Sequence, residues 1–140
     1  MDKVLIDTDV LLDFFFNRKP FARYATEILN LCEENKLRGF TSPVIISNVY
    51  YLLRKTGKHD IIVEKIKQLL SIIEIIKMDK NTVLNALNSE FKDFEDAIQN
   101  FSAIENGEIM VILTRNIKDF KKSELAILTP ETYLKGKANH

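Results

Sequence analysis

The sequence has 140 residues, 46% hydrophobic and 29% charged, with only 4 Gly and 3 Pro, which is typical of one compact domain spanning residues 1–140. Twenty basic and twenty acidic residues cancel, so a strong overall positive field for nucleic acid is excluded and any such contact depends on local basic patches. The single cysteine excludes an intrachain disulfide, and without a signal peptide or an apolar run of about 18 residues we expect a soluble cytoplasmic protein with no membrane contact.

Short apolar segments alternate with amphipathic ones along the chain. The apolar segments predict strands at residues 4–6, 38–42, 74–78, 109–113 and 126–128. Periodic apolar positions predict helices at about residues 8–17, 20–32, 43–53, 59–72, 82–87 and 94–106. The polar tail, His140 included, is expected to fray. Strands separated by helices favour an α/β fold, a three-layer α/β/α sandwich with a central and mainly parallel sheet.

Three acids follow or lie near the first predicted strand, in the stretch VLIDTDVLLDFFF. Asp7 ends the strand, at the edge where sites form in parallel α/β sheets. Asp9 either caps the following helix, a role that Thr8 could also fill, or reaches a cation. Asp13 lies one helical turn further and is expected to be a solvated or supporting group. Only Asp7 therefore requires a functional explanation, because a carboxylate at the edge of a core is rarely left without a partner or a cation.

A second acidic cluster, DFEDAIQ, precedes the apolar face of the helix predicted at 94–106. In a structural interpretation, Asp93 caps this helix and Asp96 is its third residue, where acids interact favourably with the helix dipole. In a functional interpretation, Asp96 points into a cleft and meets Asp7, with Glu95 beside it. Two carboxylates at one edge repel each other unless a proton or a cation intervenes. Oxygen ligands of this kind suit Mg²⁺ or Mn²⁺, which can activate water and stabilise charge on a phosphodiester.

The segment ILTRNIKDF follows the strand predicted at 109–113 and would face the same edge of the sheet. Asn116 can supply a neutral oxygen ligand, next to Thr114 and Arg115. Asp119 either adds a charge to the site or makes a loop turn, and the turn is the preferred interpretation.

Basic and aromatic residues provide weaker signals. Arg115 and Lys118, beside the expected site, are the best candidates for phosphate contacts. The other basic groups, at residues 18–19, 54–58 and 121–122, are expected to be solvated faces. The aromatic runs at residues 14–16 and 50–51 could stack on bases but are more typical of a core or an oligomer interface.

Taken together, the quoted segments resemble a known family. A strand ending in IDTDVLLD, a later DAIQ at a helix start, then ILTRNIKDF and a closing ILTPETYL are similar in kind and order to the PIN-domain ribonucleases, over nearly the whole chain. The resemblance implies a divalent-metal-dependent endoribonuclease that acts on RNA with Mg²⁺ or Mn²⁺. Many small bacterial members are VapC-type toxins of toxin–antitoxin pairs, which implies an antitoxin protein as partner and a homodimer.

The resemblance also assigns site residues by position. Asp7 matches the family's first metal-binding acid, Asp96 matches its acid at the later helix start, and Asp9 falls where the family often has Asn or Ser. Asn48 aligns with the central acid, usually Glu, and Asn116 with the last one. An amide keeps one oxygen ligand but removes a negative charge, which weakens cation binding. The predicted site has at its centre Asp7, Asp96 and Asn116, as further metal ligands Asp9 and Glu95, and as supporting or substrate-contacting residues Asn48, Asp93, Thr114, Arg115 and Asp119.

Two alternatives are open on the sequence. IDTDVLLD also looks like the opening of haloacid-dehalogenase phosphatases, where the first Asp is the nucleophile and the second an acid–base group. That chemistry needs a later acidic pair at a strand end, whereas the strand at 109–113 is followed by Thr-Arg-Asn. The second alternative is a non-catalytic PIN-fold module for RNA binding or protein interaction. Asn48 and Asn116 favour it, and it predicts metal-independent binding without cleavage.

Overall fold

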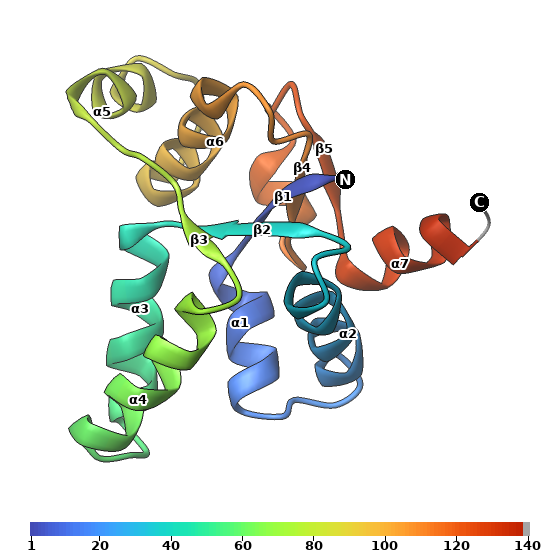
Figure 1. Cartoon of the computed structure of the whole chain (residues 1–140). Helices are drawn as coiled ribbons and strands as arrows, with labels where there is room; N and C mark the ends of the chain where they lie inside the picture. The colour runs from blue at the N-terminus through green and yellow to red at the C-terminus, as the bar shows by residue number, and fades with distance from the viewer. Residues whose placement is uncertain (139–140) are drawn as a thin grey trace.

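One parallel sheet forms the centre of the molecule (Figure 1). The computed structural model describes residues 1–138, and within them five strands lie in the order β3-β2-β1-β4-β5, with every neighbouring pair parallel. The strands are β1 (Lys3–Ile6), β2 (Arg38–Thr41), β3 (Glu74–Ile75), β4 (Val111–Leu113) and β5 (Ala126–Leu128). β1 is the central strand, and its Val4, Leu5 and Ile6 are fully buried, as expected for a strand covered on both faces. The predicted parallel sheet is confirmed.

Helices cover both faces of this sheet. They are α1 (Thr8–Phe15), α2 (Ala22–Glu33), α3 (Pro43–Arg54), α4 (His59–Leu70), α5 (Lys80–Leu87), α6 (Phe94–Asn106), the short 3-10 helix η1 (Ile117–Phe120) and α7 (Pro130–Ala138). Figure 1 shows α1 to α4 on one side of the sheet and α5 and α6 on the other, with α7 next to α2. The predicted three-layer α/β/α architecture is confirmed.

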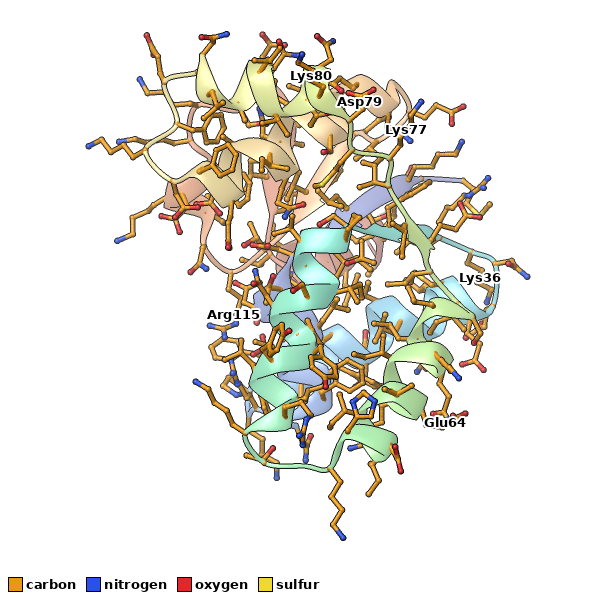
Figure 2. All side chains as sticks on the ribbon, turned by 90° about the vertical axis from the view of Figure 1, so that its left-hand side faces the viewer. Lys36, Glu64, Lys77, Asp79, Lys80 and Arg115 are labelled. Carbon is orange, nitrogen blue, oxygen red and sulfur yellow. The ribbon has the colours of Figure 1, made fainter. Side chains whose placement is uncertain are left out.

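Side chains next to the helix ends explain where several helices start and stop. Ser42 accepts a hydrogen bond from the backbone N–H of Ile45 and so caps α3, with Pro43 as the first helical residue. Asp79, labelled between Lys77 and Lys80 in Figure 2, caps α5. Gly107 ends α6 in a left-handed conformation with φ of 79°, which glycine adopts at little cost.

Several element boundaries differ from the prediction by a few residues, α7 was not predicted, and three of the differences are informative. The N-cap of α1 is Asp7, whose side chain accepts from the N–H of Thr8, so the expectation that Thr8 or Asp9 caps this helix was wrong. β3 is only two residues long, because it is an edge strand that pairs with β2 alone. The tail does not fray over residues 130–138, since α7 packs on α2 and buries Tyr133. His140 lies outside the described residues.

The strand order creates a crevice at one edge of the sheet. The chain runs outward from β1 to β2 and β3, and the α5–α6 connection then returns it to the other side of β1, where β4 pairs. The segment after β1 forms α1, whereas the segment after β4 forms η1, which contacts α6 on the opposite face. The carboxyl ends of β1 and β4 therefore mark the switch point at which sites of doubly wound sheets form.

Gly39 on β2 gives a test of packing between the sheet and α2. A Cβ atom added there would lie 2.8 Å from the Sγ of Cys32 and 3.0 Å from methyl groups of Ile6 and Ile73. We expect Gly39→Ala to lower the free energy of unfolding by about 1 to 3 kcal/mol, measured by urea denaturation. Gly136 in α7 has no atom within 4 Å of such a Cβ, so Gly136→Ala should raise stability by about 0.5 to 1 kcal/mol. Equal effects of the two substitutions would contradict this account.

Candidate active site

The crevice at the ends of β1 and β4 opens into a pocket of 570 Å³. Six carboxylates and two side-chain amides line it, and the other lining residues are leucines, basic residues and hydroxyl-bearing residues. The lining residues are Asp7, Thr8, Asp9, Leu12, Arg18, Asn48, Tyr51, Leu52, Lys55, Asp93, Glu95, Asp96, Asn116 and Asp119. The structure thus brings Asp7 and Asp96 to one pocket, together with most of the other predicted site residues. Thr114 and Arg115 do not line it.

Asp7 is fixed at the end of β1 by the segment that follows β4. Its backbone N–H donates to the carbonyl of Leu113 at 3.0 Å. One carboxylate oxygen, Oδ1, accepts from the N–H of Thr8 at 2.8 Å, and the other, Oδ2, accepts from the hydroxyl of Thr114 at 2.9 Å. The hydroxyl of Thr114 in turn accepts from the N–H of Asn116 at 3.0 Å. Thr114 is fully buried and therefore acts as a support behind Asp7.

Asp9, the second residue of α1, accepts hydrogen bonds from the same segment after β4. Its Oδ2 accepts from the backbone N–H of Arg115 at 2.9 Å and from the hydroxyl of Thr114 at 3.4 Å. Its Oδ1 is buried and has no hydrogen-bond partner within the described residues. A buried carboxylate oxygen without a donor is costly, and a cation would relieve that cost.

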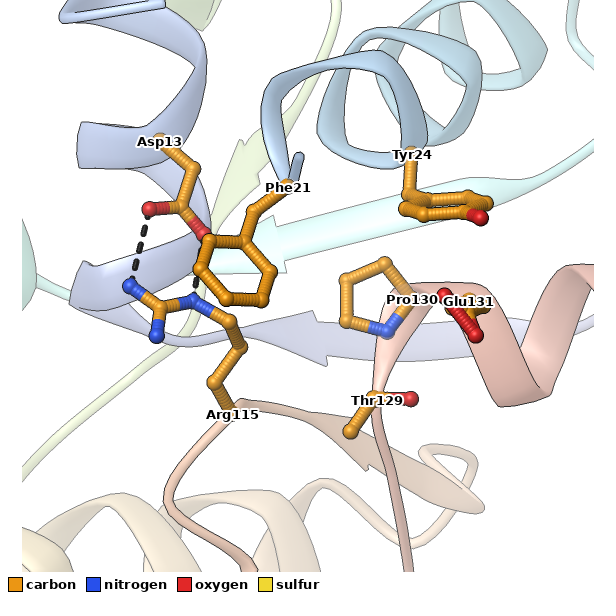
Figure 3. A pocket seen from close by; sticks show the side chains of 7 residues that line it. All are labelled: Asp13, Phe21, Tyr24, Arg115, Thr129, Pro130 and Glu131. Carbon is orange, nitrogen blue, oxygen red and sulfur yellow. Dashed lines mark hydrogen bonds and ion pairs between the residues drawn. The ribbon is translucent and has the colours of Figure 1, made fainter. Parts of the chain in front are cut away.

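Asp13 takes part in a buried ion pair behind the pocket. It is almost fully buried and forms a two-point ion pair with Arg115, whose Nε and terminal nitrogen donate at 2.7 and 2.9 Å (Figure 3). Arg18 approaches the same carboxylate at 3.6 Å, and the guanidinium carbon of Arg115 lies 3.9 Å from the centre of the Phe21 ring. Of the two roles expected for Asp13, the solvated one was wrong, because a long basic side chain from a distant segment reaches it, and the observed contacts are those of a supporting group.

This ion pair also changes the role expected for Arg115. Its guanidinium is held between Asp13 and Phe21 and lines a separate pocket of 170 Å³. Figure 3 shows Tyr24 and Pro130 on the other side of Phe21. The predicted contact between Arg115 and phosphate is not supported by this placement. The side chain joins α1 to the end of β4 instead.

The acids at the start of α6 fill both roles that the sequence left open. Asp93 caps the helix, since its side chain accepts from the N–H of Asp96 at 3.0 Å. The carboxylates of Glu95 and Asp96, in the first turn, face the pocket. Glu95 accepts a hydrogen bond from the side-chain amide of Asn48 on α3 at 3.1 Å. Capping and pocket lining are therefore compatible functions of one cluster.

The loop after β4 completes the pocket with Asn116 and Asp119. Asn116 precedes η1, and its carbonyl accepts from the N–H of Asp119 at 3.1 Å, which confirms the predicted turn. Both side chains are exposed and line the pocket as well. The preference for a turn alone at Asp119 was incomplete.

Mutual repulsion and burial perturb the acids at the pocket centre. Burial, reinforced by the charge of Asp9, raises the pKa of the Asp7 carboxyl to about 6. Burial and the charges of Asp93 and Asp7 raise the pKa of Asp96 to about 7. Burial also raises the pKa of Asp9, although the N–H of Arg115 opposes this shift. The site thus holds carboxylates whose ionised forms lack compensating positive charge, as cation-binding and catalytic sites do.

Several pocket residues escaped prediction or were ranked too low. Arg18 and Lys55 line the pocket, although both were expected to be solvated faces. Tyr51 also lines it and is 67% exposed, so it is not a core residue. It lies one turn after Asn48 on α3, and that spacing is the signal that could have identified it. Lys118 lines an adjoining pocket that shares three acids with the first.

The lining chemistry fits a hydrated hard cation. Its candidate ligands are carboxylate and amide oxygens, the type that Mg²⁺ and Mn²⁺ prefer. Within residues 1–138, no three His, Cys, Asp or Glu side chains converge closely enough to enclose an ion by themselves. Mg²⁺ keeps several water ligands and needs only one or two carboxylates, so an open site of this kind is compatible with it. The unpartnered oxygen of Asp9 and the raised pKa values of Asp7 and Asp96 agree with such a fit.

An α/β/α fold with an acidic, oxygen-lined pocket at the switch point of its sheet defines the class of protein. The chain belongs to the PIN-domain family, whose model matches residues 3–118. This membership confirms the resemblance found in the quoted motifs and leaves the haloacid-dehalogenase interpretation without support. Within residues 1–138, none of the helices combines the length and apolarity that crossing a membrane requires.

Individual relatives agree with this membership. Ribonuclease VapC1 from Aquifex aeolicus (strain VF5) is 31% identical over 137 residues, which are 94% of this chain and 93% of that protein. A chain of the toxin–antitoxin complex from Klebsiella pneumoniae has a TM-score of 0.68 at 25% identity, covering 91% of this chain and 97% of its own. A chain of VapBC2 from Rickettsia felis, bound to a DNA fragment from its promoter, shares the fold with a TM-score of 0.66 at 19% identity, over 90% and 96% of the two chains.

The ion pair between Asp13 and Arg115 makes a stability prediction. Replacing Arg115 by Leu leaves the buried Asp13 carboxylate with only the more distant Arg18, and removing one partner of a buried pair costs about 3 to 5 kcal/mol. We expect a loss of about 3 kcal/mol for Arg115→Leu, measured by urea denaturation. The double variant Asp13→Leu/Arg115→Leu should recover part of this loss, because no buried charge is left. A double variant that is less stable by the sum of both single losses would contradict the buried-charge explanation.

The raised pKa of Asp96 predicts how stability depends on pH in the absence of metal. A carboxyl whose pKa is higher in the folded than in the unfolded protein contributes stability at acidic pH that is lost as the pH rises through the folded value. For Asp96 this loss falls between about pH 4 and about pH 7. We therefore expect Asp96→Asn to raise the melting temperature at pH 8 in EDTA and to have little effect at pH 4. The control is Asp60→Asn, an exposed acid in the first turn of α4, and calorimetry is the measurement.

Proposed function

We propose that the chain is an endoribonuclease of the VapC type that hydrolyses RNA phosphodiester bonds with Mg²⁺ or Mn²⁺. The observation that carries this proposal is that six carboxylates line one open pocket at the sheet's switch point. The chain's membership of the PIN-domain family supports the same activity, as does its similarity to Ribonuclease VapC1 over nearly the whole length of the chain. A pocket so rich in unpaired negative charge is a poor site for RNA unless cations neutralise it.

In this proposal Asp7 and Asp96 hold the cation. Asn116 contributes a neutral oxygen, and Asp9 and Glu95 complete or orient the ligand set. When bound, such an ion makes water a stronger nucleophile and offsets the negative charge that develops on the phosphate.

The chain's own contribution is to keep these oxygens in place before substrate arrives. Thr8 and Thr114 each donate to one oxygen of Asp7, so its carboxylate has a fixed direction. Asp9 fixes the backbone at Arg115, and Thr114 fixes the backbone at Asn116. Preorganised polar groups of this kind lower the barrier because they need not reorient during the reaction.

Cationic and aromatic groups at the pocket wall suit an RNA strand. Arg18 and Lys55 can contact phosphates, and the exposed ring of Tyr51 can stack on a base. We assign substrate contacts to these three residues in place of Arg115. Thr114, Asp93 and Asn48 are assigned supporting roles, and Asp119 adds negative charge next to Asn116.

We further propose that the chain is the toxin of a toxin–antitoxin pair, acts in the cytoplasm and forms a homodimer. The similar chains from Klebsiella pneumoniae and Rickettsia felis belong to a toxin–antitoxin complex and to VapBC2, which supports an antitoxin protein as partner.

The activity is tested by RNA cleavage with Mn²⁺, with Mg²⁺ and with EDTA, comparing the wild type with Asp7→Asn. Loss of outer-shell partners alone costs metal sites about 10- to 100-fold, so we expect Asp7→Asn to lower the cleavage rate by at least about 100-fold. Asn is also a good helix N-cap, so the variant should fold, which circular dichroism checks. Asp60→Asn is the matched control and should cleave like the wild type.

Three outcomes of this experiment are informative. Cleavage that depends on the metal and on Asp7 supports the proposal. Equal cleavage by the wild type and Asp7→Asn would point to a contaminating nuclease. RNA binding without cleavage under any metal would replace the proposal by the non-catalytic module.

A further inference from the structure

A single side-chain hydrogen bond crosses the pocket from α3 to α6. The amide Nδ2 of Asn48 donates to the Oε2 of Glu95 at 3.1 Å, and both residues line the pocket. Within residues 1–138, Asn48 is the only donor that pairs with this carboxylate. The two helices come from opposite faces of the sheet, so the contact joins the two walls of the site.

The contact is not needed to build either helix. Ser42 caps α3 and Asp93 caps α6, each through its own side chain. Glu95 is exposed, and a hydrogen bond between exposed groups contributes little to folding because water offers the same partners. A stabilising role therefore does not explain why Glu95 turns toward Asn48.

The position of the Glu95 carboxylate is unfavourable because other negative charges surround it. Asp93 and Asp96 lie in the same helical turn, and Asp7 faces them across the pocket, so a further carboxylate is repelled from this position. An exposed Glu with several rotatable bonds could avoid this repulsion by pointing into solvent. The neutral amide of Asn48 supplies a donor that favours the inward position, whereas an acid at residue 48 would oppose it.

We propose that Asn48 and Glu95 work as a pair in which Glu95 supplies a carboxylate to the cation from α6 and Asn48 is the positioning residue that directs it. The inference rests on the proposed function, since it concerns the same cation. It assigns the negative charge of this part of the site to α6, with α3 contributing only a neutral partner. Because the two side chains share one hydrogen bond, exchanging acid and amide between them should keep one carboxylate in this part of the pocket, with the direction of the hydrogen bond reversed.

The test is the affinity for Mn²⁺, measured by isothermal titration calorimetry on the full chain without RNA. We expect Glu95→Gln to weaken binding by more than tenfold and Asn48→Ala to weaken it by about tenfold, the effect of losing an orienting partner. The exchange variant Asn48→Glu/Glu95→Gln should recover most of the affinity that Glu95→Gln loses. A merely structural role for the pair would not produce this recovery.

Matched controls separate the pair from general effects of charge. Glu64→Gln removes one negative charge from an exposed side chain on α4, labelled in Figure 2, that does not line the pocket, and Asn30→Ala removes an exposed amide on α2. Both should bind Mn²⁺ like the wild type. Thermal melts of every variant in EDTA exclude unfolding as the cause of weak binding.

Two results would overturn the inference, and they differ from failure of the proposed function. Wild-type affinity in Glu95→Gln, alongside weak binding in Asp7→Asn, would remove Glu95 from an otherwise valid site. An exchange variant that binds no better than Glu95→Gln would remove Asn48 as its positioning residue. If Asp7→Asn also binds Mn²⁺ like the wild type, the proposed cation site itself is wrong.

Discussion

The structure of the site depends on the contact between the first turns of α1 and the segment after β4. Asp7, Asp9 and Asp13 descend α1 in order, and each accepts hydrogen bonds from Thr114 or Arg115, more than 100 residues away in the chain. Two chain segments that leave neighbouring parallel strands in opposite directions would otherwise separate. The three contacts hold them together and so fix the two walls that meet at the switch point. Of these three contacts, the ion pair at Asp13 is buried, whereas the contact at Asp7 lies at the pocket.

These contacts lie beside a cluster of negatively charged side chains. Helix dipoles and hydrogen bonds at the helix starts reduce the electrostatic repulsion within that cluster. Acids in the first turns of α1 and α6 meet the positive ends of two helix dipoles. Asp93 and Asp7 also satisfy backbone N–H groups as caps, so part of each charge has a donor. These interactions do not offset burial and the neighbouring charges, since the pKa values of Asp7 and Asp96 remain raised. The protein without metal therefore carries an electrostatic strain that a bound cation would relieve, which is a usual property of a functional site.

The sequence predicts those parts of the molecule that depend on local order. Strand ends and helix starts follow from apolar runs and caps, so Asp7 and Asp96 could be assigned to one edge of the sheet before their contacts were known. Contacts made by long side chains across the fold could not be predicted in the same way. For Asp13 the solvated and the supporting role both stayed open, because nothing in its own segment shows that Arg115 reaches it. The pairing of Asn48 with Glu95 joins segments 47 residues apart, and both side chains have several rotamers, so no spacing in the sequence specifies it.

The position of Arg115 decides how a substrate can approach. An arginine next to the site would be the natural phosphate contact, but its guanidinium faces Asp13 and Phe21 and its planar group is already paired at two points. In the proposed function, contacts with RNA phosphates would then come from other sides of the pocket. Arg18 and Lys55 stand on the side of α1 and α3, and lysines at 92, 118, 121 and 122 line the adjoining pocket beyond the acids of α6. In the proposed function, an RNA strand that contacted both sets would cross the acids that the two pockets share, Asp93, Asp96 and Asp119, and its phosphates would meet positive charge on both sides of them.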